Sequence, residues 1–80
     1  MKEKGYRGVF SRMGEGLLEK FIEDLKKELE QNPEEPELLF KLGVAYCRAG
    51  KVSEAREVYK KLRELDGEKA RELLDLIYEV

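Results

Sequence analysis

Residues 41–51 read KLGVAYCRAGK and place two glycines, Gly43 and Gly50, in a run that otherwise favours a helix. An interior glycine costs a helix about 1 kcal/mol relative to alanine, so Gly43 needs a physical reason. We interpret it as a position where two helix backbones pack closely; the alternative is close approach of a bound ligand's backbone. Gly50 is interpreted as an ordinary helix stop, because glycine is the residue that most readily caps a helix C-terminus.

The size and composition of the chain indicate one small helical domain. A chain of 80 residues buries only about 60–65% of its unfolded surface, so the core is expected to be thin. Charged residues make up 42% of the sequence and prolines number two, a composition that suits helices covered in Lys and Glu. Similar Lys/Glu enrichment is found in heat-adapted proteins.

Charge is unevenly distributed along the chain. Residues 1–14 carry four basic side chains against one acidic, a balance of +3, while the other 12 basic and 17 acidic side chains give −5. A mostly acidic body argues against a dedicated nucleic-acid or membrane surface. No apolar run reaches the length of a signal-peptide core or a membrane span. With a single cysteine, which fits a reducing compartment, a cytoplasmic location is predicted.

The residue types that are missing exclude most enzyme chemistry. The sequence contains no His and no Trp, and its serines are Ser11 and Ser53. Ser–His and Cys–His nucleophile pairs and imidazole zinc sites are therefore excluded. No glycine-rich phosphate loop is present, Cys47 is interpreted as a small apolar residue, and Ser53 as a helix cap. We predict no enzyme activity, no cofactor and no metal site.

Proline and glycine divide the chain into helices. Pro33 and Pro36 mark one break, Gly50 a second, and Asp66-Gly67 a third. Strand signals are absent, and connections of a few residues make sequential helices antiparallel neighbours. The sequence predicts an all-α, antiparallel helix-hairpin array of about four helices, near residues 16–31, 36–49, 53–65 and 68–79.

An internal period of 34 residues accompanies this pattern. Shifting the sequence by 34 aligns several identical residues, and the pairs that carry most weight are Gly16 with Gly50, Leu39 with Leu73, and Leu42 with Leu76. The motif Leu39-x-x-Leu42-Gly43-x-x-Tyr46, followed by Ala55-x-x-x-Tyr59 and Gly67, resembles the tetratricopeptide repeat. Residues 36–69 resemble one complete repeat, departing from the family at Leu39 (often Trp), Tyr59 (Phe), Gly67 (Pro) and Leu62 (a small residue).

The resemblance divides the chain, 1–80, into parts of a single domain. These are a basic, Gly-rich N-terminal segment (1–15), a helix of a degenerate leading repeat (16–35), the repeat itself (36–69) and a terminal helix (70–80). It also implies that Gly43 faces the partner helix of its own hairpin, at 53–65.

The resemblance further implies a concave groove lined by the first helix of each repeat. The matching positions at 36–49 are apolar, and so are those one period later and earlier: Phe40, Val44, Cys47, Leu74, Tyr78, Tyr6, Phe10 and Met13. An apolar groove suits an amphipathic helix or an apolar peptide. We therefore expect a non-enzymatic protein–protein interaction module. The alternative is that the N-terminal segment folds over Phe40 and Val44 and completes the core.

Two further hypotheses use other parts of the chain. The last helix is apolar around much of its circumference, which suggests a homodimer built through that helix and the groove; the residues are Ala70, Leu73, Leu74, Leu76, Ile77, Tyr78 and Val80. The basic arm at residues 2–7 interleaves cations with Tyr6, as nucleic-acid-binding tails can, although nucleic acid is the least favoured partner. No membrane partner is expected.

Overall fold

A computed structural model describes residues 15–79, where the chain forms four helices and no strand. They are α2 (Glu15–Gln31), α3 (Pro36–Arg48), α4 (Val52–Leu65) and α5 (Gly67–Glu79). Each predicted boundary agrees with the structure to within one residue. The prediction of an all-α helix-hairpin array is confirmed. Predictions that involve residues 1–14 or Val80 lie outside the described residues.

The end of α3 is formed as the sequence indicates. Gly50 has a φ of 79°, a left-handed conformation that glycine adopts without steric cost. The backbone N–H of Gly50 donates to the carbonyl of Cys47 at 3.1 Å, and that of Lys51 donates to the carbonyl of Tyr46 at 2.8 Å. This pair of hydrogen bonds is a Schellman cap, which satisfies carbonyls that the helix leaves open.

Two predicted boundary residues have different roles in the structure. Ser53 is not a cap, because α4 begins one residue earlier, at Val52, after Lys51 and without a side-chain capping hydrogen bond. Gly67 is the first residue of α5 rather than part of a turn, which leaves Asp66 alone between the two helices. The Asp66 carboxylate accepts a hydrogen bond from the Lys69 backbone N–H at 3.2 Å. Asp66, which the sequence analysis treated only as part of a break between helices, therefore caps the N-terminus of α5.

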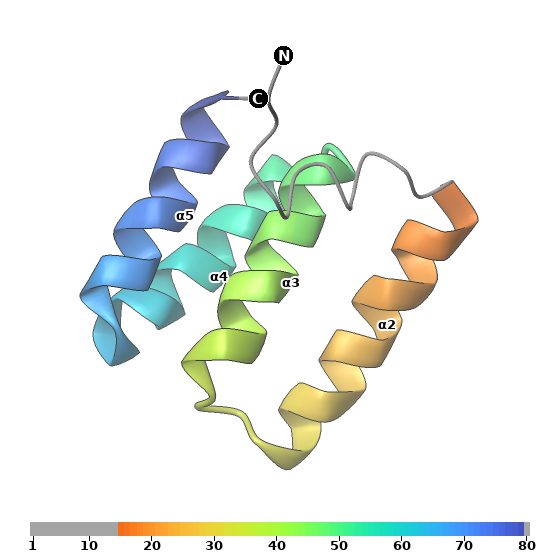
Figure 1. Cartoon of the computed structure of the whole chain (residues 1–80), viewed down its shortest axis with the longest axis horizontal. Helices are drawn as coiled ribbons and strands as arrows, with labels where there is room; N and C mark the ends of the chain where they lie inside the picture. The colour runs from red at the N-terminus through yellow and green to blue at the C-terminus, as the bar shows by residue number, and fades with distance from the viewer. Residues whose placement is uncertain (1–14, 80) are drawn as a thin grey trace.

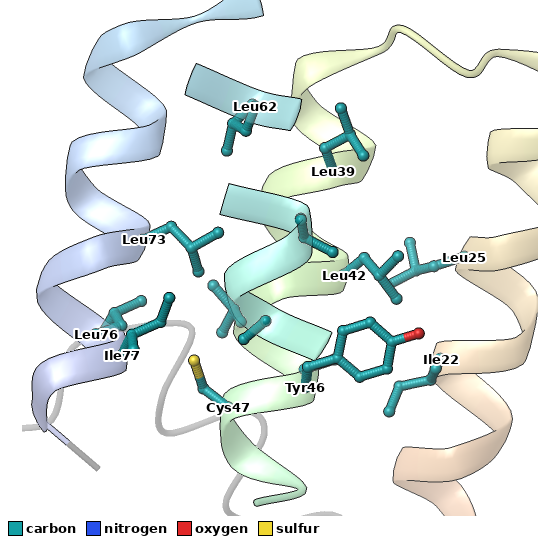
Figure 2. Packing of buried hydrophobic residues seen from close by; sticks show 14 of the residues in the cluster. Ile22, Leu25, Leu39, Leu42, Tyr46, Cys47, Leu62, Leu73, Leu76 and Ile77 are labelled. Carbon is teal, nitrogen blue, oxygen red and sulfur yellow. The ribbon is translucent and has the colours of Figure 1, made fainter. Parts of the chain in front are cut away.

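The helices pack as consecutive antiparallel neighbours around one core. Figure 1 shows α2 and α5 on opposite sides of α3, with α4 lying behind it. Leu42 and Tyr46 of α3 point toward α2, while Cys47 points toward α5 (Figure 2). The buried apolar side chains come from all four helices and form one cluster. Leu62 of α4 and Leu73 of α5 are fully buried at its centre.

Gly43 lets another helix approach α3 closely in this core, and the residue it faces differs from the prediction. A Cβ built on Gly43 would lie 2.5 Å from Cδ2 and 2.8 Å from Cδ1 of Leu73. A real Cβ essentially never comes within 3.0 Å of a heavy atom from another part of the chain. A side chain at position 43 would therefore clash, and the interpretation of Gly43 as a close-packing position is confirmed. The partner is α5, however, and not α4 of its own hairpin. Gly43 permits two helices one period apart to meet.

Candidate protein-binding surface

The predicted groove residues of the described chain lie on α3 and α5, and we call them the α3–α5 surface: Phe40, Val44, Cys47, Leu74 and Tyr78. Their accessibility differs widely. Val44 and Cys47 are 2% and 4% exposed, Phe40 and Leu74 are half-buried, and Tyr78 is 74% exposed. The other predicted members, Tyr6, Phe10 and Met13, lie outside the described residues.

One lysine joins the two helices beside this surface. The Lys69 ammonium on α5 lies 3.2 Å from the carboxylate of Glu37 on α3 and 5.7 Å from the centroid of the Phe40 ring. The hydrogen bond with Glu37, followed by the charge of Glu37, raises the pKa of Lys69 and so favours its charged form. The Lys69 charge lies within the range of a cation–π interaction with the Phe40 ring. Phe40 thus borders a charged rim rather than open solvent.

Cys47 is a buried free thiol packed within the core. Burial raises the pKa of its thiol, an effect that the neighbouring Arg48 charge partly opposes. A thiol with a raised pKa is almost entirely protonated at neutral pH, and only the thiolate attacks electrophiles. The interpretation of Cys47 as a small apolar residue agrees with this environment.

The structure also contains features that the sequence reasoning missed. A cavity of about 400 Å³ opens between α2 and the start of α4, and its lining includes Tyr46 and Lys51. The Tyr46 ring is buried, and its hydroxyl points toward α2 (Figure 2). A buried tyrosine hydroxyl usually needs a hydrogen-bond partner or contact with water. A Tyr at a predicted core position could therefore have indicated a polar opening beside it. Leu17 of α2 is a large apolar side chain that is 62% exposed, and nothing in the sequence indicated this exposure.

Residues 15–79 hold neither a candidate metal-ion cluster nor a candidate membrane span. Within that part of the chain there is no group of three or more His, Cys, Asp or Glu side chains that could hold a metal ion. None of its helices is both long enough and apolar enough to cross a membrane.

Comparison with protein families supplies the decisive observation. A family model described as Tetratricopeptide repeat matches residues 36–69. Over these residues the chain is similar to a tetratricopeptide repeat. The match covers all of α3 and α4 and the first residues of α5. No curated protein and no solved structure shows significant similarity to the chain. Tetratricopeptide repeats generally act as non-enzymatic scaffolds for protein–protein interaction.

Proposed function

We propose that the chain is a non-enzymatic protein-binding module that holds an apolar peptide or an amphipathic helix of another protein on its α3–α5 surface. The observation that carries the proposal is Tyr78, a large aromatic side chain left 74% exposed beside the half-buried Leu74 on the same helix. Such aromatic anchors dominate the energetics of many protein interfaces.

The exposure pattern determines how a partner would be held. Tyr78 and Leu74 are four residues apart on α5 and therefore share one face of that helix. Burying each would contribute about 1.5–3 kcal/mol. Lys69 is nine residues before Tyr78 on α5, about 180° around the helix, so Phe40 and the Lys69–Glu37 pair lie apart from the Tyr78 face. With so few anchors the interface is expected to bury less than about 1,200 Å², which is typical of weak or transient contacts.

A photocrosslinking experiment tests this proposal. Tyr78 is replaced by the photoreactive aromatic benzoylphenylalanine, and Glu72, an exposed residue about 120° away around α5, is replaced in a matched control. Irradiation in native lysate should yield a discrete crosslinked protein from position 78 and not from position 72. Capture should fall when Leu74 is additionally changed to Glu. Identical crosslinks from both positions would contradict a binding site on this face.

Homodimerisation, the second predicted function, would use much of the same surface. Four of the apolar residues that suggested a dimer are buried within the chain itself: Ala70, Leu73, Leu76 and Ile77. Leu74 and Tyr78 are the described members left with accessible area. In the crosslinking experiment a dimer would give a product of twice the chain's mass. Light scattering over a concentration series would then show mass rising with concentration.

Nucleic-acid binding by the basic arm is the third and least favoured function. The arm lies outside the described residues, so its test is independent of the α3–α5 surface. An electrophoretic shift that persists when Lys2, Lys4 and Arg7 are changed to Gln would remove this function. A shift that these changes abolish would support it.

A further inference from the structure

The junction between α3 and α5 shows how one helix of this fold receives another. The Glu37 carboxylate of α3 lies 3.2 Å from the Lys69 ammonium of α5. The same ammonium lies 5.7 Å from the centroid of the Phe40 ring. Farther along both helices, Gly43 lies against Leu73. The contacts advance in the same direction on the two helices, so α3 and α5 run parallel (Figure 1).

α5 repeats the register of α3 one period later. Leu39 and its counterpart Leu73 are 4% and 0% exposed, and Leu42 and its counterpart Leu76 are each 5% exposed. The two helices therefore turn corresponding sides toward the core. The edge at which α3 receives α5 has a counterpart on α5, which we call the outer α5 edge: Arg71, Leu74 and Tyr78. These positions lie within about 60° of one another around the helix.

We infer that the outer α5 edge receives a helix of another protein in the way that α3 receives α5, and that Arg71 selects a helix with an acidic side chain at the matching position. This inference rests on the proposed function and specifies the chemistry of its partner. Arg71 is exposed, Leu74 is half-buried and Tyr78 is 74% exposed. The edge therefore offers one cation beside an apolar anchor.

The charges at corresponding positions of α3 and α5 are inverted. Glu37 corresponds to Arg71 and Lys41 to Asp75, and all four side chains are exposed. On α3 the carboxylate of Glu37 receives the cation of Lys69, so Arg71 in the same position favours an anion. Within residues 15–79 Arg71 takes part in no ion pair. Its charge is therefore available to a partner.

Two further differences between the edges define the partner's apolar face. Leu74 replaces Phe40, so no ring is present at this position to attract a cation. Ile77 replaces Gly43 and is 4% exposed, so a second helix cannot approach the α5 backbone as closely as α5 approaches α3.

The contacts of α5 on α3 set the spacing within the partner helix. Lys69 meets Glu37, and Leu73, four residues later, meets Gly43. The fitting partner is therefore an amphipathic helix with Glu or Asp beside Arg71 and a small side chain four residues later. A second copy docked in the same way would place its Lys69 beside Arg71, which opposes two cations.

The test uses two synthetic peptides with the sequence of α5, residues 67–79, held helical by a side-chain lactam on the face opposite Leu73. Both carry Leu73→Ala, to fit beside Ile77, and they differ at one position: one keeps Lys69 and the other carries Lys69→Glu. Each is titrated into the isotope-labelled full-length chain, whose amide shifts give the affinity and the location. The Lys69→Glu peptide should bind about three- to fivefold more tightly, as an exposed ion pair allows. The largest shifts should surround Leu74 and Tyr78.

Charge reversal in the chain identifies the residue that selects the peptide. In Arg71→Glu the preference should reverse, so that the peptide with Lys69 binds more tightly. Lys27→Glu makes the same change of charge at an exposed site of α2, on the other side of α3 (Figure 1), and should leave the preference as in the wild type. Tyr78→Glu should weaken both peptides at least about tenfold. Absence of binding, equal affinities for the wild type, or an unchanged preference in Arg71→Glu would each overturn the inference.

The outcomes separate this inference from the proposed function. Tyr78 crosslinks in lysate, with no difference between the two peptides, would remove the acidic specificity alone. The expected peptide preference without Tyr78 crosslinks would support the inference and count against the proposed function alone. A chain that doubles in mass as its concentration rises, and loses peptide binding as it does so, would assign the outer α5 edge to a second copy and overturn the inference.

Discussion

The two junctions that α3 makes, with α5 on one side and with α2 on the other, are built differently. At α5 the absence of a side chain at Gly43 lets the fully buried Leu73 lie directly on the α3 backbone. At α2 the contact is made by side chains, Ile22 and Leu25 meeting Tyr46 and its neighbours (Figure 2). A cavity of about 400 Å³ opens at one end of the α2 junction.

This difference indicates where the fold tolerates change. The match to the tetratricopeptide repeat starts at Pro36 and includes Gly43, so the close junction begins inside the repeat while α2 precedes it. Close-packed interiors respond to the loss or gain of a single methyl group. The α3–α5 junction should therefore be intolerant of substitution, whereas the outer face of α2 should accept most changes.

The largest effect is expected from Leu73→Ala. Leu73 has no exposed surface, so its truncation should leave a cavity and cost about 3–5 kcal/mol of unfolding free energy. Leu17→Ala on α2 removes the same atoms from a side chain that is 62% exposed and should change stability by less than about 0.5 kcal/mol. Urea denaturation followed by circular dichroism measures both. Similar losses in the two variants would contradict the contrast between the junctions.

A pair of glycine substitutions sharpens the comparison without removing any atoms. Gly16 lies in the first turn of α2 with no heavy atom within 4 Å of a built Cβ, so Gly16→Ala should stabilise the protein by less than about 0.5 kcal/mol, since the propensity gain is largest in a helix interior. Gly43→Ala, in the interior of α3, gains about 1 kcal/mol of propensity but overpacks Leu73, at a cost of about 1–3 kcal/mol. Its net effect should be a loss of up to about 2 kcal/mol.

A double-mutant cycle identifies the cause of that loss. Leu73→Val removes the Cδ atoms that a Cβ at position 43 would meet. Gly43→Ala should therefore cost less in the Leu73→Val background than in the wild type. If its cost is the same in both backgrounds, the clash is not with Leu73.

The comparison also shows how much of the fold the sequence could predict. Helix boundaries and the cap at Gly50 depend on local preferences, which act within a few residues, and they were predicted correctly. The prediction that Gly43 faces the helix at 53–65 was wrong, since its neighbour is Leu73 of α5. Helical spacing shows on which side of its own helix a residue lies, but it does not show which other helix packs there. The prediction that Ser53 caps a helix was wrong, because α4 begins one residue earlier, at Val52, with Lys51 in the capping position.

Predicting the candidate site from the sequence has a related limit. Spacing placed Phe40, Val44 and Cys47 together on α3, yet the exposure of these residues ranges from half-buried Phe40 to nearly inaccessible Val44. Exposure depends on what packs across a helix, which a pattern along one helix does not contain. The Lys69–Glu37 ion pair depends on two helices one period apart and was missed for the same reason.

A smaller effect is expected from the single residue that joins α4 to α5. The Asp66 carboxylate accepts the Lys69 backbone N–H, and removing such a cap costs about 1 kcal/mol. Asp66→Ala should therefore destabilise the protein by about this amount, and Asp66→Asn, which can still cap, by much less. Asp75→Ala, at an exposed site on α5, is the matched control. Equal losses at positions 66 and 75 would show that the cap contributes nothing.

The smallest effect is a pH dependence confined to the α3–α5 junction. Cys47 points toward Ile77 of α5 (Figure 2), and burial raises the pKa of its thiol above the ordinary value of 9.0. The unfolded chain therefore releases the thiol proton at a lower pH than the folded chain does. Above about pH 9 unfolding is accompanied by proton release, so the stability of the folded state falls as the pH rises further. Denaturation of the wild type and of Cys47→Ala at pH 7, 9 and 10 should show a loss that is larger in the wild type. Parallel curves for the two proteins would mean that the Cys47 thiol is not shielded from water by this junction.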